Sequence, residues 1–64
     1  GEAKSALTDL NSALRLVPNH RLALKDRGDL LCRLGQYDMA KIDYNHLLRM
    51  DTRSQSAFMG LARV

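Results

Sequence analysis

The sequence repeats itself with a period of 34 residues. When the chain is aligned with itself at that offset, seven of the thirty overlapping positions are identical. Unrelated segments of ordinary composition would share roughly two. The identical pairs are Gly1/Gly35, Ala6/Ala40, Asp9/Asp43, Asn11/Asn45, Leu14/Leu48, Arg15/Arg49 and Ala23/Ala57. Other pairs keep their apolar character, such as Leu10/Tyr44 and Leu24/Phe58. A period of this length is typical of proteins that stack one supersecondary unit on the next.

Within each period the apolar residues have helical spacing. Steps of three and four residues place them on one stripe of a helix. The stripes are Ala3, Ala6, Leu10, Ala13 and Leu14; then Leu24, Gly28, Leu31 and Cys32; then Tyr37, Ala40, Tyr44, Leu47 and Leu48. No stretch alternates apolar and polar residues for long enough to indicate a strand. We therefore predict an all-α fold of antiparallel helix–turn–helix repeats with about four helices.

The breaks between helices fall at residues that favour turns and caps. Pro18 ends the first apolar stripe, and Asn19 is expected to cap the next helix. Gly35 follows Leu34, where a left-handed residue would end the second helix and start a tight turn. Asp51 and Thr52, together with Ser54, supply polar caps before the last apolar segment. The predicted helices cover about residues 2–16, 20–34, 37–50 and 54–63.

The 34-residue unit resembles the tetratricopeptide repeat. In that family a helix pair carries large apolar residues, a small residue in each helix and aromatic residues in the second helix. The residues that match are Leu24, Gly28, Leu31, Gly35, Tyr37, Ala40, Tyr44 and Leu47. The resemblance implies a fragment of an α-solenoid. Residues 1–20 would form the second helix of a preceding repeat, 21–54 a complete repeat, and 55–64 the first helix of a following repeat.

The resemblance also implies how the helices pack. Small residues at Gly28 and Ala40 would let the paired helices approach closely, and Tyr37 and Tyr44 would fill the space between successive helices. Arg27 departs from the pattern, because the family usually buries a leucine at that position.

An arginine there must extend to the surface or pair with a carboxylate such as Asp26 or Asp43. Thr52 replaces the proline that usually closes the unit, so the third helix could run on.

In the family, the first helix of each pair lines a concave groove that receives a peptide or helix of a partner protein. The resemblance therefore implies a protein-binding scaffold. The implied groove positions are Leu22, Lys25, Asp29, Cys32, Arg33, Ser56, Met59 and Arg63. Leu22 and Met59 would contact apolar side chains, and Lys25 and Arg33 would contact acidic groups.

One subset of the family clamps the C-terminal carboxylate of its ligands with lysine and asparagine residues. Lys25 matches the first lysine, but Asp29 and Gly60 stand where asparagines are expected. We therefore do not expect this chain to be such a clamp.

Chemically reactive side chains form no recognisable catalytic arrangement. Cys32 with His20 or His46 could be a nucleophile and its base or a zinc site, but their spacing matches no ligand or catalytic pattern. Asp26 and Asp29 could be an acid/base pair, but a solvated helix face in which Asp29 pairs with Arg33 explains them more simply. We predict no enzymatic activity and no metal or cofactor.

Charge and composition limit the remaining classes. A net charge of +3 is compatible with nucleic-acid binding, and helical repeats that bind RNA have similar lengths. The pairs Lys25/Met59 and Asp29/Arg63 show no repeated polar code, which makes RNA binding a weaker hypothesis than protein binding. An RNA-binding repeat and a purely structural spacer are kept as alternatives. The single cysteine fits a reducing compartment such as the cytoplasm, and no apolar run could span a membrane.

The ends of the chain carry apolar residues that a neighbouring helix would cover. Leu7, Leu10 and Leu14 lack a preceding first helix, and Phe58, Leu61 and Val64 lack a following second helix. We therefore expect a homodimer, or concentration-dependent association, through these terminal helices.

Overall fold

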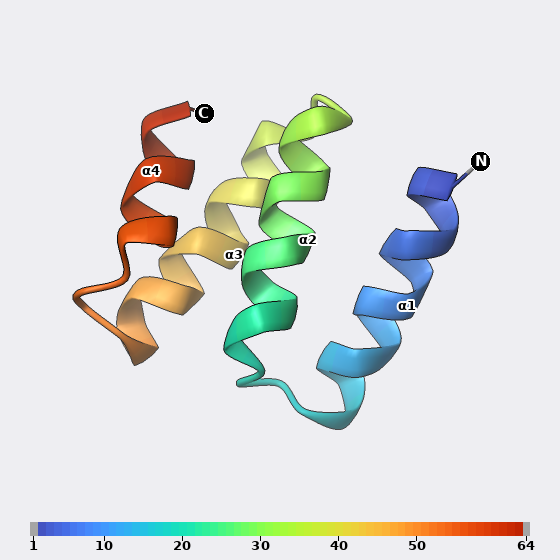
Figure 1. The fold of residues 1–64 in the computed structure, drawn as a ribbon, viewed down its shortest axis with the longest axis horizontal. Coiled ribbons are helices and arrows are strands. Elements are labelled where there is room, and N and C mark those ends of the chain that lie inside the picture. The colour runs from blue at the N-terminus through green and yellow to red at the C-terminus, as the bar shows by residue number, and fades with distance from the viewer. Residues whose placement is uncertain (1, 64) are drawn as a thin grey trace.

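The structure is a computed structural model that describes residues 2–63, and these form four α-helices and no β-strand (Figure 1). The helices are α1 (Glu2–Leu16), α2 (Arg21–Arg33), α3 (Tyr37–Met50) and α4 (Gln55–Arg63). Consecutive helices run in opposite directions (Figure 1). The predicted all-α class and four helices are confirmed, and every predicted helix boundary agrees within one residue. In the described part of the chain, no helix is long and apolar enough to cross a membrane.

Side-chain caps start α2 and α4. His20 precedes α2, and its Nδ1 accepts a hydrogen bond from the backbone N–H of Ala23 at 3.2 Å. The prediction that Asn19 is this cap was wrong. Ser54 precedes α4, and its Oγ accepts from the N–H of Ala57 at 3.3 Å, so Ser54 is the cap among the three predicted polar residues. His20 and Ser54 are one period apart, so the same position begins both helices.

Gly35 ends α2 and reverses the chain. Its φ angle is 78°, in the left-handed region that only glycine adopts without strain. The Gly35 N–H donates to the carbonyl of Cys32 at 3.1 Å, and the Gln36 N–H donates to the carbonyl of Leu31 at 2.9 Å. These two bonds form a Schellman turn, which satisfies the last carbonyls of the helix. The predicted turn at Gly35 is confirmed.

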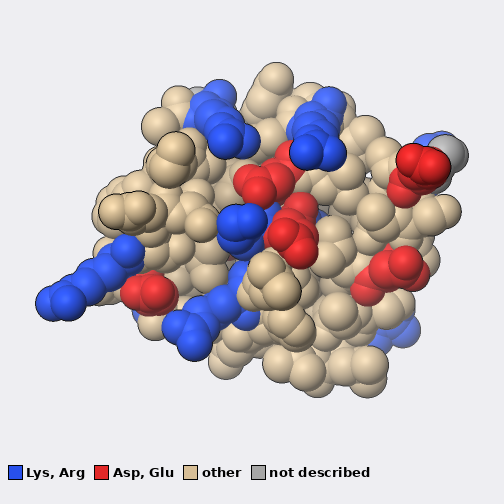
Figure 2. Space-filling view, viewed as in Figure 1, with Lys and Arg blue, Asp and Glu red and all other residues tan. Residues whose placement is uncertain are grey.

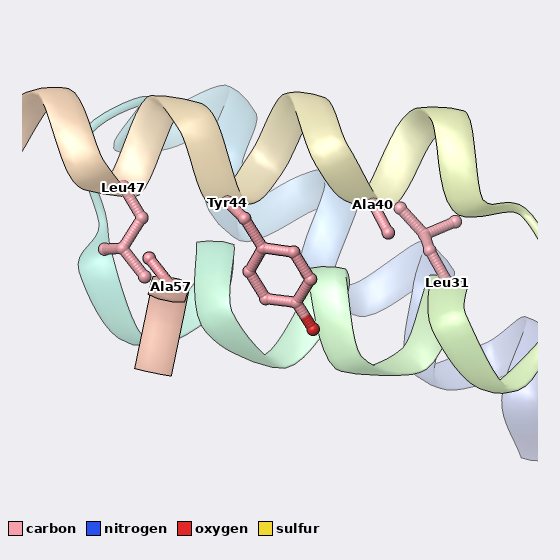
Figure 3. Close-up of a cluster of buried hydrophobic side chains, with 5 residues drawn as sticks. All are labelled: Leu31, Ala40, Tyr44, Leu47 and Ala57. Atoms are coloured by element: carbon pink, nitrogen blue, oxygen red, sulfur yellow. The ribbon is translucent and has the colours of Figure 1, made fainter. Parts of the chain in front are cut away.

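The larger of two apolar clusters joins α2, α3 and α4. It consists of Leu31, Ala40, Tyr44, Leu47 and Ala57, all almost completely buried (Figure 3). A smaller cluster of Leu14, Ala23 and Leu24 joins α1 to α2. Leu14, which was expected to lack the partner of a preceding first helix, is thus covered within the chain by α2.

Tyr44 is the centre of the packing between α2, α3 and α4. Its ring is completely buried and is held between two glycines. A Cβ on Gly28 would lie 2.8 Å from the Tyr44 ring, and a Cβ on Gly60 would lie 2.2 Å from it. The predicted roles of Gly28 and Tyr44 are thus confirmed. Tyr37 was wrongly predicted to fill a similar space, because it begins α3 and is 50% exposed.

Arg27 pairs with Asp43, one of the two carboxylates predicted for it. Arg27 Nε and Nη2 donate to the two Asp43 oxygens at 2.7 and 2.6 Å, and Nη1 donates to Asn11 at 3.0 Å. The pKa of Arg27 is raised, chiefly by its hydrogen bonds to Asp43.

The absence of a proline at Thr52 does not extend α3, which ends at Met50 before an extended Asp51.

Candidate functional site

Two adjoining hollows lie between α2 and α4, and together they are called the α2–α4 groove. One hollow is lined by Asp29, Cys32, Arg33, Tyr37 and Arg63, and the other by Lys25, Asp29, Ser56, Met59, Gly60 and Arg63. Seven of the eight site residues expected from the sequence lie in this groove. Leu22 does not line it, although its side chain is 61% exposed near the start of α2.

Asp29 in the groove accepts a hydrogen bond from a residue of the core. The buried Tyr44 hydroxyl donates to Asp29 Oδ1 at 2.5 Å, and Lys25 Nζ lies 3.8 Å from Oδ2. The predicted pair of Asp29 with Arg33 does not form, since Asp29 pairs with the residue one turn before it. Burial, followed by the hydrogen bond to Asp29, raises the pKa of the Tyr44 hydroxyl. Tyr44 therefore remains a neutral donor to Asp29 Oδ1.

The groove has two arginines that are not used in the fold. Lys25 already lies 3.8 Å from Asp29 and 3.9 Å from Asp26. Among residues 2–63, no carboxylate lies within 4.0 Å of the guanidinium groups of Arg33 or Arg63. Figure 2 shows basic side chains over the C-terminal ends of α2 and α4, and acidic side chains over the middle of α2. One end of the groove is therefore basic.

Two groove residues were not expected there from the sequence. Gly60 contributes only backbone, because its missing side chain makes room for Tyr44. Tyr37 presents its exposed ring beside Arg33 and Arg63. The exposure of Tyr37 could have been anticipated, because it follows Gly35 so closely that it stands in the first turn of its helix.

The reactive side chains considered in the sequence do not form a common site. Cys32 is half-buried, and its Sγ lies 3.8 Å from the Tyr44 hydroxyl. His20 caps α2, and His46 Nε2 lies 3.2 Å from Asn19 Oδ1. In the described residues, no three His, Cys, Asp or Glu side chains come together in a way that could hold a metal ion.

Comparisons of this chain with protein-family models, with curated proteins and with solved structures find no match.

Proposed function

We propose that the chain is a protein-binding module of tetratricopeptide type, which receives a peptide or helix of a partner protein in the α2–α4 groove. The observation that carries the proposal is the pair Arg33 and Arg63. They stand on different helices, line the same hollow and have no carboxylate partner among residues 2–63. Unused arginines on adjacent helices are suited to binding a carboxylate, which a guanidinium can bind through two parallel hydrogen bonds.

Features that recur one period apart support the repeat architecture. His20 and Ser54 cap equivalent helices. Ala23 and Ala57 are equivalent and are both buried between helices. α2 contacts α1, α3 and α4, so the helices are stacked in sequence order. In such a stack α2 and α4 are the first helices of their pairs, which line the binding groove in the tetratricopeptide family.

The chemistry of the groove describes the partner. An acidic side chain would lie between Arg33 and Arg63, beside the exposed ring of Tyr37. A neighbouring apolar side chain would cover Met59, which is 60% exposed. Lys25 is less available than the sequence suggested, since Asp26 and Asp29 lie beside it. Recognition of acidic groups therefore depends on Arg33 and Arg63.

Selection from a random peptide library on the immobilised chain tests the proposal. The enriched peptides are then titrated against the double variant Arg33→Glu/Arg63→Glu. We expect them to contain aspartate or glutamate and to lose affinity by about tenfold or more, because charge-assisted hydrogen bonds are lost.

The matched control is Arg15→Glu/Arg49→Glu, which changes the net charge equally at exposed positions on α1 and α3. This variant should bind the selected peptides as the unmodified chain does. Failure to enrich any peptide, or equal loss of affinity in both double variants, would count against binding in this groove.

A further inference from the structure

A second surface, between α1 and α2, has the kinds of residues that bind a helix elsewhere in this chain. This α1–α2 hollow is lined on the α1 side by Ala6, Asp9 and Leu10, and on the α2 side by Lys25, Asp26, Asp29, Leu30 and Arg33. One period later, the equivalents of the first three residues are Ala40, Asp43 and Tyr44. Those are the residues of α3 on which α2 itself is seated. A helix that enters this hollow would therefore make with α1 the contacts that α2 makes with α3.

We propose that α4 of a second copy of this chain occupies the α1–α2 hollow, so that copies associate head to tail. α4 is the helix equivalent to α2 by the 34-residue period: Phe58 corresponds to Leu24 and Ala62 to Gly28. In its own chain, Ala57 and Gly60 are buried, whereas Phe58 is 56% exposed and Ala62 is also exposed. α4 thus keeps an uncovered face of the kind that α2 uses against α3.

The equivalence also predicts which residues meet. α2 faces α4 with Lys25 and Asp29, whose equivalents on α4 are Met59 and Arg63. α4 faces α2 with Ser56 and Gly60, whose equivalents on α2 are Leu22 and Asp26. α2 would therefore face the incoming helix with Leu22 and Asp26. Met59 of the incoming helix would therefore cover the exposed Leu22.

Charge favours the same occupant. Arg63 of the incoming helix would approach Asp26, whose nearest cationic neighbour is Lys25 at 3.9 Å. On the other side of the seat, the small Ala62 would face Leu10, as Gly28 faces Tyr44 within the chain. The junction would thus bury Leu22, Phe58 and Met59, which are each more than half exposed in the single chain.

Such a junction joins two different surfaces, so it does not close on itself after two copies. The average mass should therefore grow with concentration rather than stop at a dimer. The junction shares Met59 and Arg63 with the peptide groove, but neither Leu22 nor Phe58 lines that groove, so substitutions at Leu22 and Phe58 test the junction alone. The two proposals can therefore fail separately.

Two single substitutions each block one side of the junction. Phe58→Asp blocks the incoming helix and Leu22→Asp blocks the receiving surface, and both change exposed side chains that the fold does not bury. We expect each variant alone to weaken association by about tenfold or more, since burial of a large apolar side chain is lost. The matched control is Ile42→Asp, at a side chain that is 67% exposed on α3 and outside the junction.

The measurement is light scattering coupled to size exclusion over a wide range of loading concentrations. The unmodified chain and the Ile42→Asp variant should associate over the same concentrations, and each blocked variant alone should remain monomeric to concentrations at least about tenfold higher. An equimolar mixture of Phe58→Asp and Leu22→Asp should give a species of twice the monomer mass and none larger, because only one junction can form.

A charge exchange gives a second test that does not depend on apolar side chains. Asp26→Arg should weaken association, and adding Arg63→Glu to the same chain should restore it. An unmodified chain that is monomeric at every concentration would overturn the inference. So would a mixture of the two blocked variants that remains monomeric, or an Ile42→Asp variant that loses association.

Discussion

Gly60→Ala tests whether Tyr44 determines how closely α4 packs. In an exposed helix interior, replacing glycine by alanine usually stabilises by about 0.5–1 kcal/mol, because alanine loses less backbone entropy on folding. Gly60 lies in the middle of α4, so propensity alone predicts a more stable protein. Contact with the Tyr44 ring predicts the opposite sign.

The magnitude follows from the geometry at the ring. A Cβ at residue 60 would lie 2.2 Å from Tyr44 Cζ, and ordinary contacts begin at 3.4 Å. Either α4 moves away by about an ångström, or the ring moves and its hydrogen bond to Asp29 is lost. Overpacking of this kind typically costs about 1–3 kcal/mol. After the gain in helix propensity is subtracted, we expect a net loss of about 1–2 kcal/mol. This should lower the midpoint of thermal unfolding by roughly 4–16 °C for a domain of this size.

Thermal and urea unfolding followed by far-UV circular dichroism measure the effect. The control is the same substitution in a Tyr44→Leu background, since leucine occupies the equivalent position at Leu10. The cost of Gly60→Ala should become smaller there, because the side chain it contacts is smaller. A Gly60→Ala protein that is more stable than the unmodified chain would show that α4 does not pack on Tyr44 as described.

Three further predictions concern the buried polar groups and the helix caps. Arg27→Leu should destabilise by about 3–5 kcal/mol in urea unfolding, because Asp43 is buried and loses its partner; adding Asp43→Ala should recover part of the loss. The raised pKa of Tyr44 means that the folded state favours the neutral hydroxyl, so this stabilisation is complete below pH 10.0 and is lost as pH rises further. The free energy of unfolding should therefore fall more steeply above about pH 10 in the unmodified chain than in Tyr44→Phe. His20→Ala should lower the free energy of unfolding by about 0.5–1 kcal/mol, whereas His20→Ser should preserve it, because serine also accepts at this position; equal stability of both variants would show that the cap contributes nothing.

The helices could be predicted from the sequence because their signals are local. Apolar spacing shows which residues share a helix face, and Gly35 and Pro18 interrupt that spacing. The resemblance to the tetratricopeptide repeat implied eight groove positions, and seven of them line the two adjoining hollows.

The cap of α2 and the partner of Asp29 could not be predicted from the sequence, because each depends on which neighbour a side chain reaches in the fold. Asn19 and His20 are both able to cap α2, and only the backbone path selects His20. Asp29 can pair with Lys25 one turn before it or Arg33 one turn after it. The Tyr44 hydroxyl comes from another helix and draws Asp29 toward the core, which no pattern within α2 could reveal.

Asp29 and Gly60 also explain why the groove differs from a carboxylate clamp. A clamp would need an amide side chain at both positions. At residue 60 any side chain would meet the ring of Tyr44, and at residue 29 the carboxylate accepts the hydrogen bond of that same buried tyrosine. An asparagine at position 29 would be a weaker, uncharged acceptor for this hydroxyl. The packing of one core residue thus removes two positions of the clamp, and the proposed recognition of a carboxylate rests on the arginines at the ends of α2 and α4.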